Sequence, residues 1–149
     1  HGTFVKPSPA LTEGTLLSGQ HMLICEDNAL NREIVENLLQ NQGIEVTSAA
    51  DGAEGVRLFR EAPVGTYDAV LMDLRMPVMD GFAASAAIRA LSRPDASQVP
   101  ILAMSADVYA EDVERCLRAG MDGHLPKPLD IVRLFQMLSE KSRSRRSGM

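Results

Sequence analysis

Short apolar runs and amphipathic segments alternate along the chain from residue 21 onward. Five runs have the length and composition of strands. They are HMLICED, IEVTSA, YDAVLMD, VPILAMSA and a short strand within MDGHLPKP. Two of them, HMLICED and YDAVLMD, suit strands that are buried on both faces of a sheet. The pattern therefore predicts five strands.

The segments that follow these runs have helical spacing. The first helix is expected to carry one apolar face, made of Leu30, Ile34, Val35, Leu38 and Leu39. Asn28 is its expected N-cap and Gly43 its expected stop. Four further helices are expected, over residues 51–62, 82–92 and 107–119 and around a closing face of Ile131, Leu134, Phe135 and Leu138.

Strict alternation of strand and helix predicts an α/β fold, a doubly wound parallel sheet with right-handed crossovers and helices on both faces. In open sheets of this kind the functional crevice lies outside the carboxyl ends of the strands, near a switch in strand order. Reactive side chains are therefore expected at that edge.

Composition sets the boundaries of this domain. The 149 residues suffice for one domain, with residues 1–20 expected to form a linker and residues 21–140 the folded unit. Residues 141–149 hold four basic residues and no acid, which predicts a basic tail.

The net charge of −5 leaves an acidic body, which argues against direct nucleic-acid binding. The sequence has no apolar run long enough to span a bilayer, so we expect no membrane contact by this chain.

The cysteines and histidines point away from a disulfide or a zinc site. Cys25 lies in a strand-like run and Cys116 on a helical face, without metal-ligand spacing. Both are expected to be reduced core residues of a cytoplasmic protein.

Reactive residues follow the predicted strands. Taken singly, each has an ordinary structural interpretation, such as a helix cap, a turn residue or a surface charge. Their shared position at the ends of different strands is harder to explain in that way. These residues are Glu26, Asp27, Asp73, Ser105 and Lys127.

The chemistry of such a pocket is specific. Neighbouring carboxylates repel, and a hard divalent ion with oxygen ligands offsets this repulsion. An aspartate can act as a nucleophile that forms an acyl phosphate, while lysine and serine contact the phosphoryl oxygens. The pocket is suited to phosphoryl transfer to a carboxylate.

The stretch from about residue 21 to 140 resembles a response-regulator receiver domain of two-component signalling. The resemblance is carried by Glu26-Asp27, by Asp73 in LMDLRMPVMDG, by Ser105 in ILAMSAD and by Lys127 in LPKPLD. It implies a flavodoxin-like sheet of order 2-1-3-4-5 with five helices.

The resemblance also implies residue roles. Asp73 would be the phosphoacceptor, and Asp27, Asp73 and the backbone carbonyl of Arg75 would bind Mg²⁺ (or Mn²⁺), with Glu26 acting through a water. Lys127 would contact one phosphoryl oxygen and Ser105 another, and the Lys127–Pro128 peptide bond would be cis.

Two features are particular to this chain. The switch position on the last strand, usually aromatic in the family, is His124, which titrates near neutrality. Arg75 and Asp107, two residues beyond the phosphoacceptor and the serine, are expected to flank the path of water and to act as a gate on phosphoryl lifetime.

CEDNALNREIVENLL resembles receivers attached to hybrid sensor histidine kinases. The expected partners are a histidine kinase dimerisation domain or a histidine phosphotransfer protein, and a weak homodimer is left open. The parent could be membrane-anchored, and the domain itself would catalyse only its own phosphorylation and dephosphorylation. A stand-alone response regulator is the alternative.

Two other classes fit less well. A Mg²⁺-dependent phosphatase with an aspartate nucleophile needs a general acid two residues after that aspartate. Here the residue two positions after Asp73 is Arg75, which cannot act as a general acid. A flavin-binding protein would want a phosphate-cradling loop after the first strand, where acidic Glu26 and Asp27 would repel the phosphate.

Overall fold

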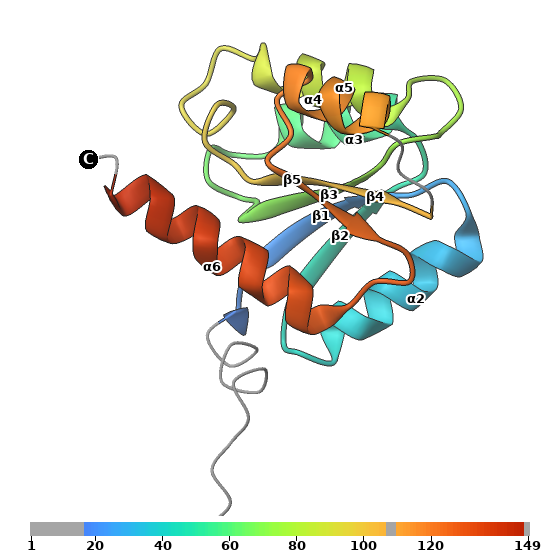
Figure 1. Ribbon diagram of the computed structural model, residues 1–149, viewed down its shortest axis with the longest axis vertical. Coiled ribbons are helices and arrows are strands. Elements are labelled where there is room, and N and C mark those ends of the chain that lie inside the picture. Colours follow the sequence, from blue (N-terminus) through green and yellow to red (C-terminus); the bar gives the residue numbers. More distant parts are fainter. Residues whose placement is uncertain (1–16, 107–109, 148–149) are drawn as a thin grey trace, which may run out of the picture.

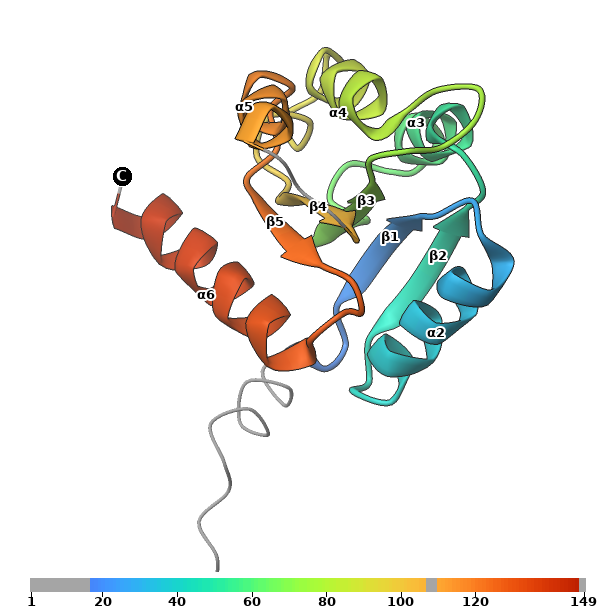
Figure 2. The same cartoon turned by 45° about the vertical axis from the view of Figure 1, so that its right-hand side comes forward.

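The fold is a five-stranded parallel sheet covered by helices on both faces (Figures 1 and 2). The computed structural model describes residues 17–106 and 110–147. Within them the sheet has the order β2-β1-β3-β4-β5, as predicted. The strands are β1 (His21–Cys25), β2 (Glu45–Ala49), β3 (Ala69–Asp73), β4 (Ile101–Ser105) and β5 (Gly123–Pro126). The helices are α2 (Ala29–Gln40), α3 (Gly52–Glu61), α4 (Gly81–Arg89), α5 (Ala110–Arg118) and α6 (Ile131–Ser147).

The sheet separates two apolar cores. Helices α3, α4 and α5 lie on one face and α2 and α6 on the other (Figure 2). Along β1, Leu23 and Cys25 join the first core, whereas Met22 and Ile24 join the second. Because side chains alternate across a strand, a strand buried on both faces must be apolar at every position. This explains the continuous apolar runs in the sequence.

Helix α2 begins as predicted but buries only part of its expected apolar face. The Asn28 side chain caps the helix by accepting a hydrogen bond from the Asn31 backbone N–H. Val35 is buried, but Leu30 is 66% exposed and Ile34 45% exposed. Helical spacing marks a face, but it does not reveal how much of that face a neighbouring element covers.

The helix ends differ slightly from the predicted boundaries. Helix α2 ends at Gln40, and Gly43 lies in the following turn with a φ of 79°. Helix α6 continues to Ser147, beyond the predicted boundary at residue 140. Among the described residues, no helix is both long and apolar enough to traverse a membrane.

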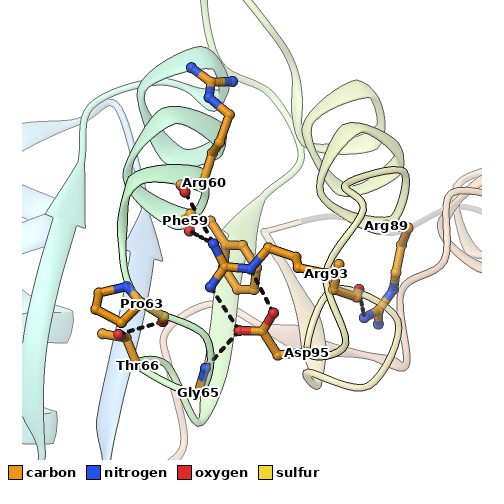
Figure 3. Close-up of polar contacts among 9 residues, drawn as sticks. Phe59, Arg60, Pro63, Gly65, Thr66, Arg89, Arg93 and Asp95 are labelled. Carbon is orange, nitrogen blue, oxygen red and sulfur yellow. Dashed lines mark hydrogen bonds and ion pairs between the residues drawn. The ribbon is translucent and has the colours of Figure 1, made fainter.

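Arg93 binds together several segments at the amino-terminal edge of the sheet (Figure 3). Its guanidinium pairs with both carboxylate oxygens of Asp95 at 2.7 and 3.0 Å. It also donates to the carbonyls of Phe59 and Arg60, in the last turn of α3. Those carbonyls have no partner within their own helix, so Arg93 satisfies groups that would otherwise need water.

Candidate functional site

Three acids meet at the carboxyl edge of the sheet. Strands β1 and β3 are neighbours in register, so Glu26, which follows β1, lies beside Asp73, which ends β3. Carboxylate oxygens of Glu26, Asp27 and Asp73 all lie within 4.8 Å of one another. Glu26 and Asp73 are buried and Asp27 is exposed. The structure thus brings together the three acids that the sequence placed at this edge.

Lys127 reaches the same cluster from the end of β5. Its Nζ lies 2.7 Å from Glu26 Oε1 and 3.4 Å from Asp73 Oδ2. The peptide bond between Lys127 and Pro128 is cis, as the resemblance implies. The ammonium therefore bridges two carboxylates that would otherwise face each other without a counter-charge.

The two buried acids differ in their pKa. Burial and the neighbouring charge of Glu26 raise the pKa of Asp73 to about 6. Burial alone would also raise the pKa of Glu26, but hydrogen bonds from Lys127 and the Asn28 backbone N–H hold it below its usual range. The pKa of Lys127 is raised, because its two acidic partners outweigh the effect of its burial. Lys127 is thus a stable cation, and the charged form of Asp73 is less well stabilised than that of Glu26.

Ser105 lies on β4, the strand next to β3, and His124 lies on β5, the edge strand next to β4. Ser105 is buried at the end of β4, and its carbonyl accepts a hydrogen bond from the Lys127 backbone N–H at 3.0 Å. His124 pairs in register with Ala103, and burial lowers the pKa of its half-buried imidazole, with a smaller effect from the charge of Arg133. Within the described part of the chain, His124 Nε2 has no hydrogen-bond partner.

Arg75 has an acidic partner that the sequence did not reveal. Asp107 lies outside the described residues, so the predicted pair of Arg75 with Asp107 stays a prediction. Among the described residues, the Arg75 guanidinium donates to Asp112 Oδ2 at 2.8 Å. Asp112 could have been noticed as an acid one helical turn before Cys116, on the same face of its helix.

A second missed residue is Arg32 on α2. Its guanidinium donates to the Glu26 backbone carbonyl at 2.8 Å, and so holds the loop after β1 in place. Arg32 is not part of the apolar face that the helical pattern marks. Its contact depends on the path of the loop after β1, which the sequence does not reveal.

This arrangement has the groups needed for phosphoryl chemistry. The clustered oxygens suit a hard divalent cation, for which one or two carboxylates and several waters are the usual ligands. The Asp73 carboxylate has the Lys127 ammonium beside it. A cation at this position would offset the negative charge that a phosphoryl group brings.

Comparison with known proteins gives the same answer. Residues 22–139 match the model of the response regulator receiver domain family. A hybrid signal transduction histidine kinase (kinase I) of Dictyostelium discoideum is 30% identical over 85% of this chain, which spans only 7% of that kinase.

Solved structures agree with this assignment. The receiver domain of sensor histidine kinase PA1611 from Pseudomonas aeruginosa, solved with a magnesium ion in its active-site cleft, is 40% identical, with a TM-score of 0.72. That match covers 83% of this chain and 97% of the other. The receiver domain of Ssk1 from Saccharomyces cerevisiae, solved with the histidine phosphotransfer protein Ypd1, has a TM-score of 0.71 and 26% identity. It covers 87% of this chain and 92% of the other. Fold, acidic site and family match converge, and this chain belongs to the response-regulator receiver domain family.

Proposed function

We propose that this receiver accepts a phosphoryl group from a phosphohistidine onto Asp73, in a reaction that requires Mg²⁺ (or Mn²⁺). The observation that carries the proposal is the cluster of Glu26, Asp27 and Asp73 with Lys127 bridging two of them. An Asp73 oxygen forms the new bond to phosphorus, while the bond from phosphorus to the imidazole nitrogen breaks and leaves its electron pair on that nitrogen.

The other residues divide the work around Asp73. Asp27, Asp73 and the carbonyl of Arg75 would hold the metal ion, and Glu26 would act through a water. A bound ion would offset the carboxylate charges and the negative charge of the incoming phosphoryl group. Lys127 moves from its bond with Glu26 to a second phosphoryl oxygen.

Ser105 donates a hydrogen bond to the remaining phosphoryl oxygen and moves toward it. The movement leaves room for His124 to turn inward, and this pair forms the switch. The half-buried state of the His124 ring and the buried position of Ser105 support this part of the proposal.

Labelling with a small phosphodonor tests the proposal. Wild-type protein, Asp73→Asn and the surface control Glu114→Gln are each incubated with acetyl phosphate and Mg²⁺. We expect base-labile labelling of the wild type and of the control, and none of Asp73→Asn. EDTA should abolish the labelling. Equal labelling of Asp73→Asn would show that Asp73 is not the acceptor, and labelling that persists in EDTA would show that the reaction does not require the metal ion.

An apolar surface next to the acids suits the phosphohistidine donor. Exposed Leu30 and Ile34 lie on α2, and a groove beside them is lined mostly by apolar side chains. The groove also includes Glu26 and Lys127, so a partner seated there would reach the site. Its lining comprises Glu26, Asn31, Ile34, Val35, Met104, Pro126, Lys127, Pro128 and Leu129. We assign this surface to a helix of a histidine phosphotransfer protein or kinase dimerisation domain.

Substitutions on this surface separate docking from chemistry. Leu30→Asp and Ile34→Asp should slow transfer from a phosphorylated histidine phosphotransfer protein at least tenfold, because burying a carboxylate in an apolar contact is costly. Labelling by acetyl phosphate should not change. Leu117→Asp, at an exposed position on the opposite face of the sheet, is the matched control. Equal loss in Leu117→Asp, or no loss in the α2 variants, would reject this docking surface.

The parent protein is proposed to be a hybrid histidine kinase in which this receiver is one domain, and the similarity to a hybrid kinase supports this. A stand-alone regulator remains the alternative, and kinase motifs in the same open reading frame would decide. A cytoplasmic location is proposed because both cysteines are free, buried thiols.

A further inference from the structure

Helix α5 is held to the domain by an unusual buried residue. Between residues 112 and 118 the buried side chains are Asp112 and Cys116, while Val113 and Leu117 are exposed. Buried acids normally need a counter-charge, because removing a carboxylate from water is costly. The attachment of this part of α5 therefore depends on what faces Asp112.

The group that faces Asp112 comes from the loop after the proposed phosphoacceptor. Arg75 lies two residues beyond Asp73, and its Nη2 is 2.8 Å from Asp112 Oδ2. The Asp112 side chain is 5% exposed and that of Arg75 is 60% exposed. The guanidinium thus lies over a buried carboxylate and keeps its other side in water. It can leave this position at little cost to itself, whereas Asp112 would lose its cation.

Phe82, in the first turn of α4, adds a second link. The Arg115 guanidinium carbon lies 3.9 Å from the centre of its ring, and that of Arg75 lies 6.0 Å from it. Both are within the range of cation–π attraction. Asp112 and Arg115 are one helical turn apart, so α5 meets the loop through Asp112 and the first turn of α4 through Arg115.

We propose that the Arg75–Asp112 ion pair is a latch that holds α5 against the phosphoacceptor loop, and that Arg75 couples the charge on Asp73 to the position of α5. The coupling rests on the proposed phosphorylation of Asp73. A phosphoryl group adds about −1.5 to −2 charge two residues from Arg75 and competes with Asp112 for the guanidinium. Because coupling is reciprocal, removing the Asp112 carboxylate, which releases the guanidinium, favours the phosphorylated conformation.

Hydrogen exchange of the α5 amides in unmodified protein, with EDTA present, tests the latch without any phosphoryl group. Arg75→Ala should speed exchange in α5 about tenfold relative to β1 and β3, because it leaves a buried carboxylate without its cation. Asp112→Asn, which keeps the side-chain size, should speed it less. The double variant should exchange more slowly than Arg75→Ala, since removing both charges costs less than removing one.

The control is Glu114→Gln on the same helix. Glu114 pairs with Arg118 at 3.1 Å, but both partners are exposed and on α5, so this pair links no second element. Exchange in Glu114→Gln should match the wild type. Unchanged α5 exchange in Arg75→Ala, or a double variant that exchanges faster than Arg75→Ala, overturns the latch.

A second arm tests the coupling with beryllofluoride and Mg²⁺ as the phosphoryl mimic. Binding to the wild type should speed exchange in α5. Arg75→Ala, which has no guanidinium to pass between the two partners, should show little further change in α5. Asp112→Asn, in which the guanidinium is already released, should bind the mimic more tightly than the wild type. Binding of the mimic is followed by its fluorine NMR signal. If the mimic binds and hydrogen exchange in α5 does not change, the proposed coupling is wrong. If wild-type protein does not bind the mimic, the proposed function and the coupling fail together, while the first arm still decides the latch.

Discussion

At the scale of single residues, Asp73 is an acid in an environment that favours its neutral form. Its pKa of about 6 in the folded protein exceeds its ordinary value of 3.8, through burial first and the charge of Glu26 second. An acid whose pKa is raised by folding destabilises the fold once it ionises, so the cost grows as the pH rises between these two values. This cost is expected of a site that, as we propose, receives a cation and a phosphoryl group.

We therefore predict that Asp73→Asn stabilises the metal-free protein. At pH 7 its free energy of unfolding should exceed that of the wild type by about 1–3 kcal/mol, and the gain should vanish at about pH 3 and below, where the carboxyl is protonated in both states. Urea unfolding in EDTA at both pH values measures this. Glu140→Gln, at an exposed acid, is the control. A less stable Asp73→Asn at pH 7 would contradict this account of the pocket.

Val78 offers a second test at this scale. It lies in the loop between β3 and α4 with a φ of 69°, and its side chain is 83% exposed. A β-branched residue is strained in this left-handed conformation. Val78→Asn should raise the free energy of unfolding by about 0.5–1 kcal/mol, whereas Val64→Asn, at another exposed valine, should change it by less than about 0.5 kcal/mol. Thermal unfolding distinguishes the two, and a destabilised Val78→Asn would reject the strain.

At the scale of elements, Arg93 stabilises a junction far along the chain from its own position. It joins the loop after α4 to the last turn of α3, and its guanidinium carbon lies 4.9 Å from the centre of the Phe59 ring. Asp95 completes the link by accepting the Gly65 backbone N–H. Helix α4 ends at Arg89, three residues before the predicted end at residue 92, and no pattern in the sequence pointed to this network.

We predict that Arg93→Ala lowers the free energy of unfolding by about 2–4 kcal/mol, because a largely buried, bidentate ion pair is broken and carbonyls lose their donors. Arg57→Ala is the matched control, since Arg57 pairs with Glu61 at 3.0 Å but is exposed. It should cost less than about 1 kcal/mol. Chemical denaturation gives both values, and equal losses would show that burial does not set the difference.

The elements also show where sequence patterns stop being informative. Apolar runs located β1, β3 and β4 because strands covered on both faces have few polar positions, whereas β2 and β5 are only partly buried. The site residues could be grouped because parallel strands end at one edge. The exposure of Leu30 and the pairing of Asp112 could not be foreseen, since both depend on which distant segments pack against a helix. Such contacts are set by the tertiary structure and not by local periodicity.

At the scale of the whole molecule, the two edges of the sheet differ in character. The amino-terminal edge is closed by Arg93 and its partners (Figure 3), while the carboxyl edge gathers like charges. The groove proposed for docking lies on the α2 side of the carboxyl edge and the Arg75–Asp112 pair on the α5 side. Asp73 lies on the strand between them, so an event at this residue can be received on one face and reported on the other.

The most direct measurement is to locate the phosphoryl group after transfer from a phosphorylated histidine phosphotransfer protein in the presence of Mg²⁺. The account predicts that peptide mapping finds it on Asp73 in the wild type, and that Asp73→Asn leaves the donor phosphorylated. A phosphoryl group on any other residue, or equal transfer to Asp73→Asn, would contradict the central claim that this carboxylate is the acceptor.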